Sequence, residues 1–151
     1  MRTLFFILLA PCLTALALPH PEWTVQSVDA TQTPFGTSLA FDSAGVPFVS
    51  FRGNASQSLF VSRFDGMNWI TTEVDATANV GTYSSLALDG SGHPAVSYND
   101  GTNNDLKFAR YDGTMWNVET VDSIGSVGTY TSLAFNPSGR PVIAYKSQTN
   151  V

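Results

Sequence analysis

The sequence has little charge, and most of that charge is negative. Only 13% of its 151 residues are charged, and 7 Lys and Arg stand against 12 Asp and Glu, giving a formal net charge of -5. Nucleic acids and anionic membrane surfaces are bound through clustered positive side chains, so this balance excludes both as partners. The hydrophobic fraction of 43% also excludes an intrinsically disordered chain.

The first residues have the pattern of a targeting signal. Arg2 is followed by an apolar run from Leu4 to Leu9, and Ala15-Leu16-Ala17 offers small residues for cleavage. We therefore predict a secretory signal peptide over residues 1–17, which leaves no membrane span once it is removed. A membrane anchor fits less well, because Pro11 interrupts an apolar stretch that is shorter than the roughly 20 residues a span needs.

The only cysteine, Cys12, falls inside this signal. A lipoprotein signal would use it, but Pro11 stands where such a signal needs a small residue. Without residues 1–17 the chain has no cysteine, which excludes disulfides, thiol catalysis and Cys-based zinc sites. We expect a protein that is secreted, periplasmic or on the cell surface, with no cofactor or metal and with a short linker over residues 18–22.

The rest of the chain repeats itself. Ser-Leu-Ala-Phe-Asp at 38–42 recurs as Ser-Leu-Ala-Leu-Asp at 85–89 and as Ser-Leu-Ala-Phe-Asn at 132–136, each copy 47 residues after the last. A Gly-x-Pro turn follows each copy, and an Asp-Gly-x-x-Trp motif occurs twice. The repeated positions are Gly45, Gly92 and Gly139 in the turns, Asp65 and Asp112 in the hairpins, and Trp69 and Trp116 after them, with Trp23 standing 46 residues before Trp69.

One unit contains four short segments with an apolar period of two, which is typical of strands. In the middle unit they are residues 84–89, 95–98, 106–111 and 116–121, and Asp112-Gly113 makes a tight hairpin between the last two. Tandem four-stranded antiparallel units of this length are typical of β-propeller blades. We therefore predict an all-β fold, with the first strand of each unit innermost.

The predicted strands do not complete a ring. Propellers close with about four to eight blades, whereas residues 23–151 supply fewer than three. We assign a lone strand to 23–28, blades to 37–74 and 84–121, and half a blade to 131–146. We expect the chain to need further blades of the same protein, or other copies, to close the ring.

The repeat resembles known secreted bacterial proteins. Ser-Leu-Ala-Leu-Asp-x-x-Gly-x-Pro, followed by Leu-Lys-Phe-Ala-x-Tyr-Asp-Gly-x-x-Trp, is similar to the repeats of sialidase-like (BNR or Asp-box) and lectin-like propellers across residues 23–146. The Asp-box itself is Ser-x-Asp-x-Gly-x-x-Trp, so the adjacent Asp112 and Gly113 depart from it. The Asp-Gly-x-x-Trp hairpin is also similar to the turn of propeller lectins that bind fucose and related sugars.

Positions shared by every unit are interpreted as structural. The three glycines supply turns, Asp65 and Asp112 brace their own hairpins, and the three tryptophans favour core packing over sugar stacking. Function should instead sit where the units differ, on the face that carries the longer polar loops. The candidate ligand-binding residues on that face are Tyr83, Tyr130, Asn99, Asp100, Asn103, Asp105, Arg52 and Lys146.

No catalytic constellation can be assembled from the sequence, since nothing pairs a nucleophile with a base and an orienting carboxylate. The segment 99–105 is rich in oxygen ligands, but its spacing does not match a calcium-binding EF-hand loop. The sequence favours a non-catalytic propeller segment that binds a glycan or a protein through its long-loop face. A fragment of a sialidase-like glycoside hydrolase and a structural module of a larger cell-surface protein are the alternatives.

Overall fold

The computed structural model describes residues 4–7, 23–29 and 31–149, and these contain strands and turns but no helix. None of the described residues accordingly forms a helix long and apolar enough to cross a membrane. The strands are β1 (Leu4–Ile7), β2 (Trp23–Gln26), β3 (Pro34–Phe41), β4 (Pro47–Gly53), β5 (Leu59–Phe64), β6 (Trp69–Asp75), β7 (Val80–Leu88), β8 (Pro94–Asp100), β9 (Asp105–Tyr111), β10 (Trp116–Asp122), β11 (Thr129–Phe135) and β12 (Pro141–Lys146).

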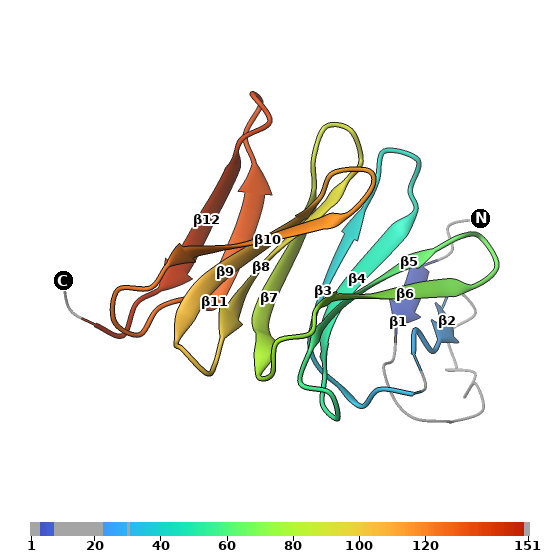
Figure 1. The fold of residues 1–151 in the computed structure, drawn as a ribbon. Helices are drawn as coiled ribbons and strands as arrows, with labels where there is room; N and C mark the ends of the chain where they lie inside the picture. Colours follow the sequence, from blue (N-terminus) through green and yellow to red (C-terminus); the bar gives the residue numbers. More distant parts are fainter. Residues whose placement is uncertain (1–3, 8–22, 30, 150–151) are drawn as a thin grey trace.

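Most strands belong to three antiparallel sheets that stand side by side (Figure 1). The first sheet has the order β3-β4-β5-β6, the second β7-β8-β9-β10, and the third consists of β11 and β12 alone. All neighbours within these sheets are antiparallel. The prediction of an all-β fold built from four-stranded antiparallel sheets is confirmed, and the described residues form no closed ring.

The two strands near the N-terminus pair with each other in parallel, Leu4 opposite Trp23 and Ile7 opposite Gln26. β1, at Leu4–Ile7, lies inside the signal peptide that the sequence predicts over residues 1–17. The other residues of that signal, and the linker at 18–22, lie outside the described residues. Removal of the signal stays a prediction.

The inner strand of each sheet begins earlier than the repeat pattern indicates. β7 starts at Val80, within a stretch that the sequence assigns to a loop, and β3 and β11 likewise start before residues 37 and 131. The pairing of β7 with β8 shifts register twice on the way, and Gly81 and Tyr83 have positive φ of 89° and 54°. Such bulges break the alternation of apolar and polar residues, so a search for period two misses this part of the strand.

The turns that follow the innermost strands β3, β7 and β11 share one backbone conformation. Gly45, Gly92 and Gly139 have φ of 82°, 80° and 77°, a conformation that costs glycine little. In the first turn, the carboxylate of Asp42 accepts hydrogen bonds from the backbone N–H groups of Ala44 and Val46. The proline that follows each turn starts the next strand.

Apolar clusters join the sheets to one another. Phe48 and Val61 of the first sheet pack with Leu86 and Val96 of the second. Between the second and third sheets, Ala95 and Phe108 pack with Leu133. Because burial of such side chains stabilises by about 1.5–3 kcal/mol each, the contacts between sheets hold the stack together and fix the space that remains between their outer strands.

Candidate functional site

A cleft of about 550 Å³ opens between the first and second sheets. Its volume lies in the range of about 300–1,000 Å³ that is usual for small-molecule sites. Side chains of β4, β5 and β6 form one wall, and the turn before β8 and the hairpin between β9 and β10 form the other. The lining residues are Phe48, Val61, Arg63, Ile70, Thr72, Gly92, His93, Pro94, Tyr111, Thr114, Met115 and Trp116.

The hairpin that carries Trp116 into the cleft is held by its own aspartate. Asp112 accepts hydrogen bonds from the backbone N–H groups of Met115 and Thr114, at 2.9 and 2.8 Å, and one from the Asn117 amide. These bonds favour the charged carboxylate and lower the pKa of Asp112. The Trp116 ring, half-buried, lies 5.7 Å from the ring of Tyr111, so the two aromatic rings form one surface of the cleft.

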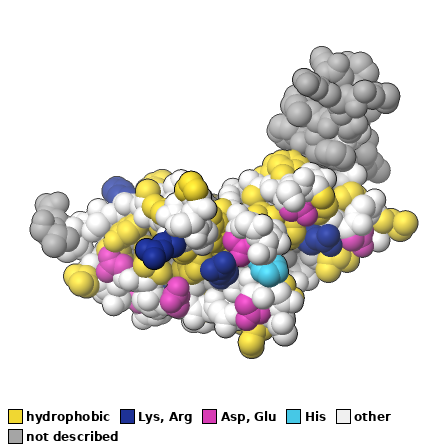
Figure 2. All heavy atoms as spheres, turned by 90° about the horizontal axis from the view of Figure 1, so that it is seen from above, with side chains coloured by type: hydrophobic (Ala, Val, Ile, Leu, Met, Phe, Trp, Pro, Cys, Tyr) yellow, Lys and Arg dark blue, Asp and Glu magenta, His cyan; other side chains and the backbone are white. Residues whose placement is uncertain are grey.

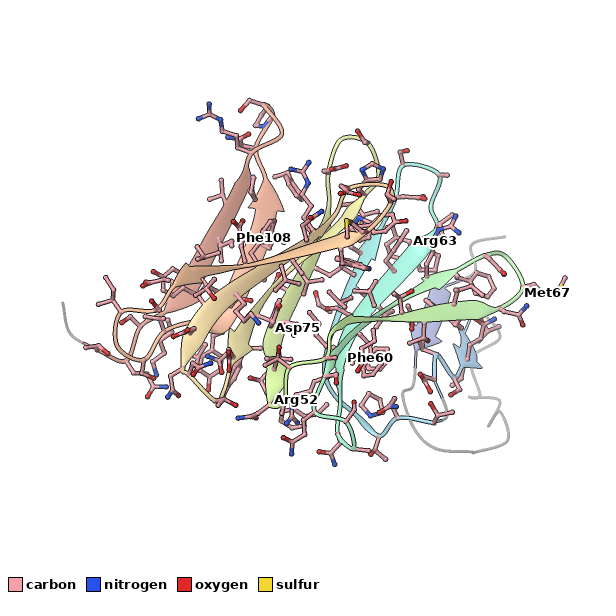
Figure 3. All side chains as sticks on the ribbon, in the orientation of Figure 1. Arg52, Phe60, Arg63, Met67, Asp75 and Phe108 are labelled. Atoms are coloured by element: carbon pink, nitrogen blue, oxygen red, sulfur yellow. The ribbon has the colours of Figure 1, made fainter. Side chains whose placement is uncertain are left out.

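Arg63 supplies a positive charge on the opposite wall, at the end of β5 that leads into the hairpin before β6 (Figure 3). Its guanidinium carbon lies 5.8 Å from the centre of the Phe48 ring. Arg110, which is 47 residues later, donates a hydrogen bond of 2.7 Å to Asp89. Arg63 is exposed, and none of the ion pairs among residues 4–7, 23–29 and 31–149 involves it.

His93 lies at the edge of the cleft, in the short turn before β8. Asp89 holds this turn by accepting hydrogen bonds from the backbone N–H groups of Ser91 and His93. Burial raises the pKa of Asp89, but Arg110 and these backbone groups outweigh burial and keep its pKa below the usual value. The His93 imidazole and the Tyr111 ring are perpendicular, with centres 6.1 Å apart, and the His93 Nδ1 lies 3.9 Å from the Asp89 carboxylate.

The cleft can therefore hold a ligand that has both apolar and polar faces. Aromatic and aliphatic side chains make most of its walls, while Arg63, His93 and the two threonines offer hydrogen bonds at its rim. Figure 2 looks onto the side of the molecule that carries the short turns after β3, β7 and β11. It shows exposed hydrophobic side chains together with scattered charges of both signs.

A second, smaller cleft of about 420 Å³ lies between the segment that contains β2 and the first sheet. It is lined by Gln26, Ser27, Val28, Phe64, Met67, Asn68 and Trp69. Phe64 and Trp69 precede Tyr111 and Trp116 by 47 residues, and Asp65 accepts backbone hydrogen bonds from Met67 and Asn68 as Asp112 does from its own hairpin. The same hairpin thus places a half-buried tryptophan in each cleft. The side chain of Trp23 lies outside the described residues.

The structure brings together three of the residues that the sequence proposes on the long-loop face. The rings of Tyr83 and Tyr130, both exposed, lie 4.5 Å apart, and the Lys146 ammonium lies 5.7 Å from the Tyr130 ring. Both tyrosines have positive φ, of 54° and 52°, which is uncommon for residues other than glycine. Hydrogen bonding and repulsion between the two phenols raise the pKa of Tyr83.

Four of the other residues proposed on that face, Asn99, Asp100, Asn103 and Arg52, use their side chains in hydrogen bonds within the chain, and Asp105 contributes its backbone carbonyl. Asn99 is buried and donates hydrogen bonds to the carbonyls of Val127 and Asp105. Asp100 is buried too, and its carboxylate accepts hydrogen bonds from the Thr102 and Asn103 backbone and from the Asn103 amide.

Arg52 lies on β4 at the opposite end of the sheet from Arg63 (Figure 3). It is 8% exposed, and its guanidinium donates a hydrogen bond of 3.3 Å to the Asn79 side chain. The role of Asn99, Asp100, Asn103, Asp105 and Arg52 in binding stays a prediction.

The residues of the larger cleft that the sequence analysis missed are Arg63, His93, Thr72 and Met115. A usable signal was present at three of them, because the units differ there: His93 stands where the other units have Val46 and Arg140, Thr72 where the next unit has Glu119, and Met115 where the unit before has Asn68. Arg63 gave no such signal, because it matches Arg110. The repeat pattern of the sequence did not show that the first and second sheets enclose a cleft between them. Among the residues that the structure describes, no three His, Cys, Asp or Glu side chains gather in a way that could hold a metal ion.

The fold is similar to that of a solved lectin. A fucose lectin from Kordia zhangzhouensis, solved in complex with methyl-fucoside, matches with a TM-score of 0.50 and 16% sequence identity over 73% of this chain and 82% of the lectin chain. No protein-family model and no curated protein sequence matches the chain. At this level of identity the similarity concerns the fold, and it shows a lectin-like β structure.

Proposed function

We propose that this protein is a non-catalytic carbohydrate-binding protein and that the cleft between the first and second sheets binds the sugar. The observation that carries the proposal is that Trp116 and Tyr111 lie on one wall and the exposed Arg63 on the other, with no ion pair to Arg63 among the residues that the structure describes. A pyranose has an apolar face of C–H groups and a rim of hydroxyls. Aromatic rings accommodate the former, and a guanidinium binds the latter.

The proposed architecture is part of a β-propeller. Three sheets that stand side by side, each with its first strand next to the first strand of its neighbour, support this interpretation. So does the lectin-like fold of the Kordia protein. Secretion, proposed from residues 1–17, would place the cleft among extracellular or surface glycans.

Methyl-fucoside is the first probe, because the fold neighbour was solved with it. Its methyl group suits a cleft whose walls are mostly apolar. A glycan array identifies further sugars, and isothermal titration calorimetry with the best of them measures the dissociation constant. We expect saturable binding to the purified protein.

Two variants locate the site. Arg63→Ala removes a charged hydrogen-bond donor worth about 1.5–3 kcal/mol, so we expect binding to weaken by about tenfold or more. Arg140→Ala is the matched control, because Arg140 is exposed in the turn between β11 and β12 and lies outside the cleft lining.

The outcome distinguishes the two faces of the molecule. Loss of binding in Arg63→Ala, with Arg140→Ala unchanged, supports the cleft. Loss of binding in Tyr130→Ala, with Arg63→Ala unchanged, would move the carbohydrate site to the long-loop face that the sequence predicts. No binding to any glycan on the array would overturn the proposed function.

A further inference from the structure

We propose that copies of this chain associate head to tail, with the exposed face of the third sheet of one copy packing on the inner part of the first sheet of the next. The proposal is independent of the carbohydrate site. It rests on an interface between sheets that the chain forms twice and whose two halves both stand exposed at the ends of the stack.

Hydrogen bonds show that the two internal interfaces have one pattern. The hydroxyl of Ser38 in β3 accepts a hydrogen bond of 3.0 Å from the backbone N–H of Leu86 in β7. The hydroxyl of Ser85 in β7 accepts one of the same length from Leu133 in β11. Donor and acceptor shift together by 47 residues, so each sheet offers a serine acceptor on one side and a leucine N–H on the other.

The third sheet exposes the face that the other two bury. Val142 stands 47 residues after Ala95 and is 55% exposed, whereas Ala95 is 0% exposed because the third sheet covers it. Ala134 and Ala144 on the same face are exposed as well, and so is Ser132, whose hydroxyl is the counterpart of the Ser38 and Ser85 acceptors. We call this set of residues, Ser132, Ala134, Val142 and Ala144, the trailing face.

The first sheet exposes the complementary side. Leu39 in β3 is 47% exposed, whereas Leu86 and Leu133 at the matching positions are 6% and 7% exposed. Phe41 is likewise exposed, although Phe135, its counterpart in the third sheet, packs against the second sheet. We call Leu39 and Phe41 the leading face.

The open areas also match in extent. Val28, which follows β2, is buried against Val49, Phe51 and Phe60 and so already covers the outer part of the first sheet. Only the innermost strand, β3, remains open. The third sheet has two strands, the innermost and its neighbour, and so supplies the part of a sheet that the open area lacks. In the docked pair, the Ser132 hydroxyl of one copy accepts the hydrogen bond that the Leu39 N–H of the next copy donates.

Such an interface is heterologous, since different faces of the two copies meet. Heterologous contacts give a ring where the rotation closes and an open filament where it does not. Every copy in the assembly buries both faces, except those at the ends of an open chain. A second copy is the occupant that we propose, because Ser132 and Ala134 of its trailing face repeat the serine and alanine that meet Leu86 and Leu133 within the stack.

Two variants test this by blocking one face each. Leu39→Asp places a charge on the leading face, and Val142→Asp places one on the trailing face. Sedimentation velocity of the purified unmodified chain is expected to show oligomers that dissociate on dilution, and each variant alone is expected to be monomeric. Ile124→Asp is the matched control, because Ile124 is an exposed apolar residue outside both faces, and it should assemble as the unmodified chain does.

The decisive sample is the mixture of the two blocked variants. Each retains one intact face, so head-to-tail association predicts a complex of twice the mass of either variant that grows no further. That pairing also shows that both variants are folded. An unmodified chain that stays monomeric at every attainable concentration overturns the proposal, as does a mixture that stays monomeric while the unmodified chain assembles.

Discussion

Tyr98 links the first and second sheets through a buried hydrogen bond. Its hydroxyl donates to the Asp75 carboxylate at 2.7 Å, and the Lys107 ammonium donates to the same oxygen at 2.6 Å. Asp75 lies at the end of β6, facing the middle of the molecule (Figure 3). Burial and the nearby carboxylate raise the pKa of Tyr98 above its ordinary value, so the phenol stays protonated and continues to donate.

Removing that hydroxyl should lower stability measurably. We expect Tyr98→Phe to reduce the free energy of unfolding by about 1.5–3 kcal/mol, because it removes one buried bond to a charged group. The matched control is Tyr145→Phe, since Tyr145 donates to Asp122 with the same 2.7 Å geometry but is exposed. Urea denaturation measures both. Equal losses in the two variants would contradict the role of burial.

The same carboxylate makes stability depend on pH. Burial raises the pKa of Asp75, but hydrogen bonds from Lys107, Thr77 and Tyr98 outweigh burial and hold its pKa below the usual 3.8. The unfolded chain therefore binds the proton more readily. This stabilisation is present above about pH 4 and is lost as pH falls through the pKa of the folded state. We expect the difference in melting temperature between the unmodified chain and Asp75→Asn to shrink below about pH 4. A constant difference down to pH 2 would refute the assignment.

At the scale of elements, the connection from the second sheet to the third depends on one glycine. Gly128 has φ of 82°, and a Cβ there would lie 2.7 Å from the Leu106 Cα and 2.8 Å from the Asp105 carbonyl oxygen. Those atoms are backbone and cannot move aside. Gly139 has a similar φ of 77° but open space around it.

These two glycines give a matched pair of variants. Gly139→Ala should cost about 1 kcal/mol through the backbone conformation alone, and Gly128→Ala should cost clearly more because it also forces β9 and the loop apart. Chemical denaturation of both variants measures the difference. If the two losses are the same, the close approach at β9 has no energetic weight.

Most elements from β3 onward could be predicted from the sequence, and β7 shows why part of a strand could not. The hairpins at Asp65 and Asp112 and the turns at Gly45 and Gly92 have sequence signals that act locally. The early part of β7 does not, because its bulges place Gly81 and Tyr83 out of alternation. The contact between the Tyr83 and Tyr130 rings could have been predicted, because the two residues stand 47 apart and occupy matching positions of neighbouring repeats.

At the scale of the whole molecule, the cleft could not be predicted because it depends on how two sheets are spaced. Arg63 and Arg110 occupy matching positions, yet Arg110 pairs with Asp89 whereas Arg63 lines the cleft. Only the arrangement in space separates them. The buried state of Asn99 and Asp100 was hidden for the same reason, because polar loop residues look alike in sequence whether they bind a ligand or brace a neighbouring loop.

The most direct test of the carbohydrate site is the response of the Trp116 indole to sugar. In a two-dimensional ¹H–¹⁵N spectrum recorded during titration with methyl-fucoside, the indole N–H signal of Trp116 should shift saturably, together with the backbone signals of Arg63 and His93. The signals of Tyr83, Tyr130 and Lys146 should stay in place. A saturable shift confined to those three residues would contradict the assignment of the sugar to the cleft, and no shift with any sugar that the protein binds would refute it outright.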